Sequence, residues 1–259
     1  MKPVNLAVQL YTLRNFTQTE KGLKDTFNKV AAIGYRSAQV SGIGPIPHET
    51  VKKLADEAGL SICATHVPWD RLVDDLEGVA EQHRLWNCRY VGLGSLPESY
   101  RGSADGYRTF AKQANEIALK LKNDYDLQFV YHNHHFEFEK YGDKTGLEIL
   151  FDETDPSAFG FELDLYWVQA GGGDPVEWIH KVAGRMQVVH FKDMAIVSGK
   201  QVFAEVGEGN MNYEALIRAC DETGVEWMVV EQDECRRDPF ESVDISLKYL
   251  LGKCEEVKA

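Results

Sequence analysis

Four apolar runs in the second half of the chain each end with a side chain that can bind a metal ion. These side chains are His132, Asp164, His190 and Glu231. Two imidazoles and two carboxylates suit a borderline divalent cation and leave coordination positions open for substrate oxygens. We therefore predict that the four bind one divalent metal ion, with Mn, Co, Zn, Fe and Mg as candidates.

A second set of polar side chains lies two residues beyond these positions. Side chains alternate along a strand, so a residue two positions further points to the same side, one step nearer to solvent. The set comprises His134, Tyr166, Lys192 and Asp233. We expect Asp233 and Lys192 to bind substrate, Lys192 as a point cation for a hydroxyl, carboxylate or phosphate oxygen. The alternative is that Lys192 is solvated and paired with Asp193.

Further candidates for a substrate pocket lie at or near the ends of other apolar runs. We predict that Gln9, His66 and Glu162 contact the substrate. Trp167 and Trp69 follow such runs closely and could offer a flat apolar face to a sugar ring, although packing in the core would explain them equally well.

The elements that must position these residues alternate between short apolar runs and longer helical patterns. We expect strands at residues 6–10, 35–40, 61–66, 90–92, 128–133, 160–164, 187–190 and 227–231. Between them, apolar residues recur with the helical period, as at Leu23, Phe27 and Val30. Alternating strands and helices predict a parallel sheet, and 259 residues match the usual length of about 250 for an eightfold barrel. We predict one α/β domain, a (β/α)8 TIM barrel over residues 1–259, with its active site at the carboxyl ends of the strands.

Charge and composition limit the kinds of partner. The chain has 28 basic and 41 acidic residues, a net charge of −13 that repels phosphate backbones, so we expect no nucleic-acid partner. No segment approaches the roughly 18 apolar residues that span a membrane, so we expect no membrane partner and a cytoplasmic location. The five cysteines are odd in number and form no CxxC pair, which indicates reduced thiols. The sequence leaves both a monomer and a homo-oligomer open.

Five motifs spread along the chain carry a family resemblance. They are Tyr131-His132-Asn133-His134-His135-Phe136-Glu137-Phe138, Glu162-Leu163-Asp164-Leu165-Tyr166-Trp167, His190-Phe191-Lys192-Asp193, Glu205-Val206-Gly207-Glu208-Gly209 and Val230-Glu231-Gln232-Asp233. Together they resemble the sugar phosphate isomerase/epimerase family of the xylose-isomerase-like TIM-barrel superfamily. That superfamily also contains ketose 3-epimerases, inosose isomerases and dehydratases, and the endonuclease IV type of DNA repair enzyme. The resemblance runs over essentially the whole chain and is specific for the superfamily rather than for one substrate.

The resemblance implies one divalent metal held by Glu, Asp, His and Glu at the ends of strands five to eight, which correspond to the four residues named first. The first position departs from the family, because His132-Asn133 stands where relatives commonly have Glu-Asn. In the epimerases the two glutamates are the paired acid and base, so this exchange argues against simple two-base epimerisation. His134 together with His132, or Glu137, is predicted to serve instead.

The mechanistic hypothesis is removal of a proton next to the carbonyl of a small carbohydrate substrate. A metal ion that bridges the carbonyl and a neighbouring hydroxyl would stabilise the resulting enediolate. His134 and Glu231 are the candidate bases, since histidine has a pKa of about 6.5 and a glutamate in a metal site can be retuned. Reprotonation on carbon gives an isomerase or epimerase, which the family resemblance favours. Loss of a leaving group from a keto-sugar or 3-keto-glycoside gives a lyase or dehydratase instead.

Two other classes of function remain as alternatives. A repair nuclease needs several metal ions and a basic surface that faces DNA, and the acidic net charge argues against it. A sugar-binding barrel without chemistry would bind its ligand without turnover.

Overall fold

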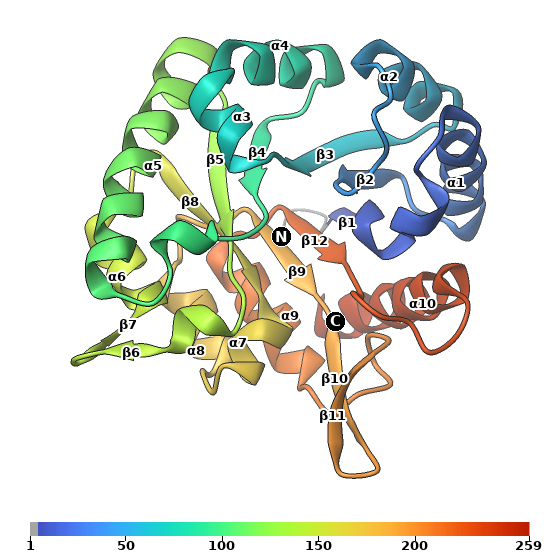
Figure 1. Cartoon of the computed structure of the whole chain (residues 1–259). Coiled ribbons are helices and arrows are strands. Elements are labelled where there is room, and N and C mark those ends of the chain that lie inside the picture. Colours follow the sequence, from blue (N-terminus) through green and yellow to red (C-terminus); the bar gives the residue numbers. More distant parts are fainter. Residues whose placement is uncertain (1–4, 259) are drawn as a thin grey trace.

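Each of the eight apolar runs forms a strand, and in the computed structural model, which describes residues 5–258, these strands close into a parallel barrel (Figure 1). Around the ring they follow one another in chain order, and the last pairs with the first. The strands are β1 (Asn5–Gln9), β2 (Ser37–Val40), β3 (Ser61–His66), β4 (Tyr90–Leu93), β5 (Gln128–His132), β8 (Phe159–Asp164), β9 (Val188–Phe191) and β12 (Trp227–Val230). The predicted (β/α)8 TIM barrel is confirmed.

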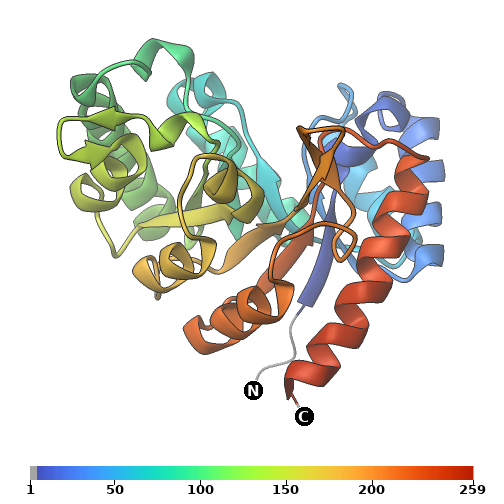
Figure 2. The same cartoon turned by 90° about the horizontal axis from the view of Figure 1, so that it is seen from below.

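Helices cover the outside of the barrel, each with one apolar face turned toward the strands. They are α1 (Glu20–Ile33), α2 (His48–Glu57), α4 (Leu76–Trp86), α5 (Ala104–Tyr125), α6 (Gly146–Glu153), α7 (Leu165–Ala170), α8 (Pro175–Lys181), α9 (Tyr213–Thr223) and α10 (Pro239–Lys258). In α1 the buried face includes Leu23, Phe27 and Val30, as their spacing predicted. Gly224 ends α9 with φ of 78°. This is a left-handed backbone conformation that residues other than glycine rarely adopt. Figure 2 shows α10 running along the outside of the barrel, where it packs against α1 and α9.

The inside of the barrel changes from apolar to polar toward the carboxyl ends of the strands. Apolar side chains, most of them small, fill the lower layer, namely Ala7, Cys63, Ala64, Tyr90, Val130, Val188 and Val229. The next inward position, two residues further along a strand, carries a polar group, as where His190 follows Val188. The apolar filling therefore stops at the height where the predicted ligands begin.

The register of the strands sets the height of each polar side chain. His132 on β5 is paired with Glu162 on β8, while Asp164, two residues further along β8, is paired with His190 on β9. Paired residues point to the same side of a sheet. Glu162 therefore points into the barrel one layer below Asp164.

Short elements extend the strands at the carboxyl-end face. They are η1 (Leu10–Phe16), α3 (Trp69–Asp74), η2 (Glu98–Tyr100), η3 (Phe136–Phe138), and the hairpins of β6 (Lys140–Tyr141) with β7 (Lys144–Thr145) and of β10 (Asp193–Val197) with β11 (Lys200–Ala204). Figure 1 shows the β10–β11 hairpin projecting from the barrel. All five cysteines are free thiols. Within residues 5–258, no helix combines the length and apolar character needed to cross a bilayer.

Candidate active site

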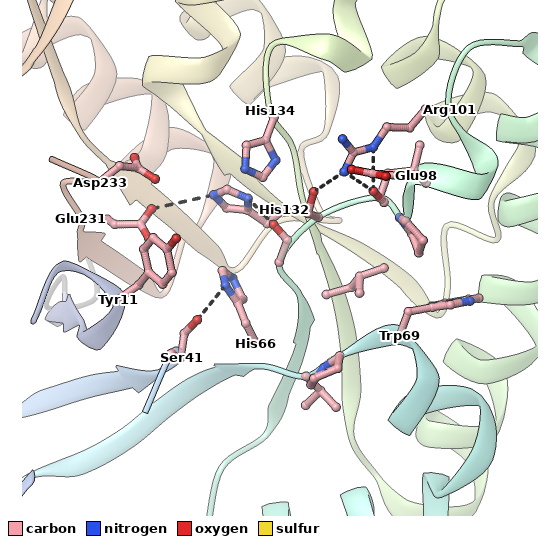
Figure 3. Close-up of a pocket in the computed structure, with 18 residues that line it drawn as sticks. Tyr11, Ser41, His66, Trp69, Glu98, Arg101, His132, His134, Glu231 and Asp233 are labelled. Atoms are coloured by element: carbon pink, nitrogen blue, oxygen red, sulfur yellow. Dashed lines mark hydrogen bonds and ion pairs between the residues drawn. The ribbon is translucent and has the colours of Figure 1, made fainter. Parts of the chain in front are cut away.

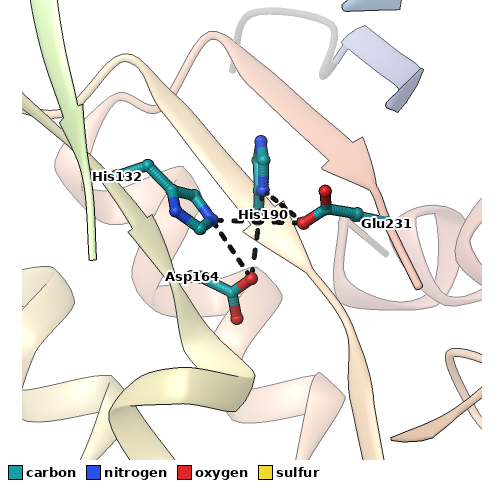
Figure 4. A group of neighbouring side chains, drawn as sticks. All are labelled: His132, Asp164, His190 and Glu231. Carbon is teal, nitrogen blue, oxygen red and sulfur yellow. Dashed lines mark hydrogen bonds and ion pairs between the residues drawn. The ribbon is translucent and has the colours of Figure 1, made fainter. Parts of the chain in front are cut away.

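The four predicted metal ligands converge at the carboxyl ends of β5, β8, β9 and β12 (Figure 4). One ligand atom from each lies within 4.8 Å of the others, and all four side chains are buried. His190 Nδ1 is 3.0 Å from Glu231 Oε2, and His132 Nε2 is 3.3 Å from Asp164 Oδ2. Strands far apart in the sequence thus bring two imidazoles and two carboxylates to one point.

Hydrogen bonds outside the cluster fix how the two imidazoles face it. His132 Nδ1 is 3.0 Å from the carbonyl oxygen of Gly94, and His190 Nε2 is 2.7 Å from Oε1 of Gln39. Only a protonated ring nitrogen can donate to such an oxygen, so these contacts leave His132 Nε2 and His190 Nδ1 facing the cluster. This donor set fits a divalent ion of the kind predicted.

Asp164 is oriented by the start of α7. Its Oδ1 accepts the backbone N–H of Trp167 at 3.0 Å, which caps the helix and leaves Oδ2 for the cluster. Its own backbone N–H donates to Oδ1 of Asn133, the residue after His132, at 3.0 Å. The Asn133 and Asp164 motifs therefore hold each other in place.

The electrostatics keep the carboxylates of the cluster ionised. Burial alone would raise the pKa of Asp164, but the charge of Lys192 outweighs it and lowers the pKa to about 2. Against burial, Lys192 and His190 likewise hold the pKa of Glu231 well below its usual range. Burial alone would lower the pKa of His190, yet the charges of Glu162 and Glu231 raise it to about 10. Ionised carboxylates are the form that binds metal, and a metal ion would displace the proton that His190 carries without it.

Lys192 differs from the expectation that it would meet substrate or solvent. Its side chain is fully buried, and Nζ lies 2.9 Å from Asp164 Oδ2 and 2.9 Å from Glu231 Oε2 while also pairing with Asp233. These three carboxylates draw the ammonium inward and hold its pKa well above the usual value, even though burial would lower it. Asp193 is not its partner, because that carboxylate accepts backbone N–H groups of the loop after β11.

A pocket of about 600 Å³ opens onto the cluster (Figure 3). His132 and Glu231 reach its surface, so a ligand in the pocket can contact two of the four cluster residues. Of the other candidate residues, His66, Trp69, His134 and Asp233 also line it. The structure therefore brings six of the candidate residues together around one space.

Gln9, Glu162 and Trp167 were predicted to contact substrate, but they do not line this pocket. Gln9 and Glu162 are fully buried beneath it. Glu162 Oε2 is 2.7 Å from His66 Nε2, and its Oε1 accepts from Nε2 of Gln39 at 2.8 Å. Glu162 supports the pocket from below, because it lies one inward position before Asp164 on β8.

Trp167 packs beside the pocket rather than in it. Its ring lies 5.5 Å from that of His134 and 5.6 Å from that of Phe203 on the β10–β11 hairpin. The hairpin thus packs against the indole, which is half-buried.

The two remaining candidate bases differ in their access to the pocket. His134 lines it, but burial lowers its pKa to about 2, so the ring is neutral rather than poised near pH 7. Glu137 is fully buried and absent from the pocket wall. Its Oε1 accepts the hydroxyl of Tyr131 at 2.6 Å and its Oε2 accepts the backbone N–H of His134 at 2.8 Å. With both oxygens engaged, Glu137 is placed to position His134 and not to meet substrate.

Several pocket residues were missed from the sequence. Tyr11, Ser41, Glu98 and Arg101 line the pocket from segments that follow β1, β2 and β4. They stand in loops and short 3-10 turns, where no periodic pattern marks a residue. Their position shortly after a strand end was the one signal that could have found them.

The comparisons with known proteins agree with the barrel fold. Residues 27–251 match the family described as xylose isomerase-like TIM barrel. An inosose dehydratase from Clostridium beijerinckii is 22% identical over 281 aligned residues, which cover 92% of this chain and 93% of that protein. Among solved structures, a sugar phosphate isomerase/epimerase from Parabacteroides distasonis superposes with a TM-score of 0.81 and 24% identity, over 96% of this chain and 98% of that one. An L-ribulose 3-epimerase superposes with a TM-score of 0.77 and 15% identity, over 99% and 96%.

These likenesses to solved structures concern the fold, whereas the family match extends over most of the barrel. The match begins within α1 and ends within α10, so it includes all four strands whose ends form the cluster. The chain belongs to the xylose isomerase-like TIM barrel family.

Proposed function

We propose that this protein is a metal-dependent enzyme that removes a proton from the carbon next to a carbonyl group of a sugar-like substrate. The observation that carries the proposal is the cluster of two imidazoles and two carboxylates on the floor of an open pocket. Relatives named inosose dehydratase support a substrate that carries many hydroxyl groups. Polar groups from several strand ends suit such a substrate.

In this proposal the divalent ion is held by the four residues of the cluster. When bound, it supplies Lewis-acid polarisation of the carbonyl and stabilises the charge that develops as the neighbouring carbon loses its proton. Glu231 is the ionised carboxylate of the cluster that reaches the pocket, which suits it to take that proton. Burial raises the pKa of the adjacent Asp233, while the charge of Lys192, with which it forms an ion pair, opposes this shift.

The lyase or dehydratase form of this chemistry has a specific observation in its favour. His66 and His134 line the same pocket as Glu231, and burial lowers the pKa of both, so both rings are uncharged and weakly acidic at neutral pH. Neither ring is therefore a strong acid for returning a proton to the opposite face of the carbon. Loss of a leaving group needs no proton on carbon, because the departing oxygen can take the proton that Glu231 removed.

Isomerisation or epimerisation is the second candidate. It is favoured by the motifs that resemble the sugar phosphate isomerase/epimerase family, but His132 stands where that family commonly has the first of its two glutamates, which argues against simple two-base epimerisation. A single group on one side of the carbon can still move a proton between neighbouring atoms of the substrate.

The test is to incubate metal-loaded protein in deuterated water with a panel of ketoses, inososes and 3-keto-glucosides. Proton NMR would follow deuterium uptake next to the carbonyl, and mass spectrometry would follow release of a leaving group. Glu231→Gln, checked for bound metal, is the matched control. Release with uptake supports the lyase form, and uptake alone supports the isomerase form. Sugar binding with neither outcome in a metal-loaded protein would refute the proposal in favour of a non-catalytic sugar-binding barrel.

A further inference from the structure

The pocket continues past the metal-binding cluster toward the loop after β4. In the ring of strands, β4 stands directly opposite β12, which ends at Glu231 and leads to Asp233. Figure 3 shows Arg101 and Glu98 on the far side of the pocket from these two carboxylates, with three histidines between them. The pocket thus has two ends with different side chains.

The volume of the pocket exceeds what one sugar ring needs. About 600 Å³ corresponds to roughly 20 water molecules at about 30 Å³ each. A monosaccharide, with roughly a dozen non-hydrogen atoms, displaces fewer than half of these waters. A ring at the cluster therefore leaves the β4 end open for a second group.

Among the described residues, hydrogen bonds hold Arg101 rigidly at this end and leave its Nη1 as a free donor. Its Nε and Nη2 donate to the carbonyl oxygen of Leu96 at 2.9 and 2.6 Å, and Nη2 also donates to Ser95 Oγ at 3.0 Å. Its guanidinium lies 4.0 Å from the ring centre of Phe136. Within residues 5–258, Nη1 has no hydrogen-bond partner and the guanidinium has no carboxylate within ion-pair distance. A pre-oriented donor without a protein partner favours a ligand at this position.

The charges around Arg101 argue against a phosphate ligand. Among the described residues that line the pocket, Arg101 is the one Arg or Lys, while Glu98, Glu231 and Asp233 are carboxylates. Phosphate sites gather several cationic or N–H donors and exclude carboxylates, because like charges repel at close range. A hydroxyl group, in contrast, can accept from Arg101 and donate to Glu98.

We propose that the loop after β4 forms a second subsite, which binds an uncharged hydroxyl-bearing ring joined to the ring at the cluster. Arg101 donates to this ring and Glu98 accepts from it, beside an apolar wall that includes Leu96 and Pro97. The substrate is then a disaccharide or related glycoside and not a phosphorylated monosaccharide. This inference rests on the proposed function, because it places the reacting ring at the cluster.

Binding measurements test the subsite without any turnover. Metal-loaded protein would be titrated by calorimetry with glucose, with cellobiose, maltose and trehalose, and with glucose 6-phosphate. We expect at least one disaccharide to bind about tenfold or more tighter than glucose, and glucose 6-phosphate to bind no tighter than glucose. Arg101→Gln should remove most of the gain for the disaccharide while leaving glucose binding unchanged. Glu98→Gln should remove part of it, and this exposed residue holds no other contact, so its variant should fold normally.

Arg84→Gln, on the outer surface of α4, is the matched control and should bind all the sugars like the wild type. Equal affinity for glucose and every disaccharide, or no binding of any disaccharide, would overturn the subsite. So would glucose 6-phosphate binding about tenfold tighter than glucose in a way that depends on Arg101. The deuterium experiment is independent of these titrations. A preference for disaccharides without deuterium uptake would count against the proposed reaction alone. Deuterium uptake with equal affinity for glucose and every disaccharide would count against the subsite alone.

Discussion

The Nε2 atom of His190 lies 3.3 Å from Oε1 of Glu162, a carboxylate that is fully buried one layer below the cluster. The other oxygen of Glu162 holds His66, whose ring is on the pocket wall. One buried charge therefore orients two imidazoles, one in the cluster and one facing the substrate space. A carboxylate behind a ligating histidine fixes the ring and raises its basicity toward the metal.

Glu162→Gln should weaken metal binding by about 10- to 100-fold, because the amide keeps the shape of the carboxylate but not its charge. Titration of the metal-free protein with Zn²⁺ or Mn²⁺ by calorimetry would measure this loss. The absorption spectrum of the Co²⁺-loaded variant should also shift, since the orientation of His190 changes. Glu98→Gln is the control, because Glu98 lines the same pocket without touching the cluster. Unchanged affinity in the Glu162 variant would show that Gln39 alone orients His190.

His190→Ala and Glu231→Ala should each lose the bound ion, since each removes one of four ligand atoms and leaves an incomplete site. Elemental analysis after dialysis against metal-free buffer would measure the loss. His180→Ala, an exposed histidine on α8, should keep the ion. Full retention in both cluster variants would refute the assignment of these ligands.

The fold was predictable because each strand is a short apolar run with a turn signal beside it. The predicted carboxyl end of every strand lies within one residue of the observed carboxyl end. This agreement arises because a parallel strand buried on both faces needs an uninterrupted apolar run. The four cluster residues were predictable for the same reason. Each closes such a run, so the barrel must place it at the carboxyl-end face.

The environment of each polar residue was less predictable, because it depends on contacts across the barrel. Gln39 and Glu162 are 123 residues apart and stand on β2 and β8, which face each other across the ring. Alternation along a strand gave the height of Lys192 but not the direction of its long side chain. The stem folds back toward three carboxylates instead of following the strand outward. Arg101 stands in a loop, where no period marks it.

Lys192→Met should destabilise the metal-free protein by about 3–5 kcal/mol, because it leaves Asp164, Glu231 and Asp233 facing one another without their shared cation. Saturating Zn²⁺ or Mn²⁺ should raise the free energy of unfolding more in the variant than in the wild type, since the ion replaces part of the missing charge. Urea unfolding with chelator and with metal would measure both effects.

The matched control for this variant is Lys120→Met, which removes an exposed ion pair to Asp124. Such an exposed pair contributes little to stability, so its loss should be small and independent of metal. A loss in Lys192→Met as small as in the control would mean that the three carboxylates do not depend on the ammonium.

Glu137→Gln should change how stability depends on pH. Burial raises the pKa of Glu137 from 4.5 to about 7, although two hydrogen-bond donors and the charge of His132 oppose it. Between these values the folded protein keeps a proton that the unfolded chain has lost, so the wild type loses stability as the pH rises through this window. The glutamine variant can hold both neighbours, with its amide oxygen accepting the backbone N–H of His134 and its amide nitrogen donating to the hydroxyl of Tyr131, and it carries no titrating group. Its stability relative to the wild type should therefore rise from pH 4.5 to pH 7 and then level off, by about 3 kcal/mol in total.

Urea unfolding of both proteins at intervals from pH 4 to pH 9 would measure this difference, in which the titration of all shared groups cancels. Glu139→Gln, with an exposed carboxylate nearby, is the control and should track the wild type at every pH. A difference that stays flat for Glu137→Gln would mean that the buried carboxylate is ionised throughout the window. In that case the hydroxyl of Tyr131 and the backbone N–H of His134 are enough to stabilise its charge, and burial does not decide its protonation.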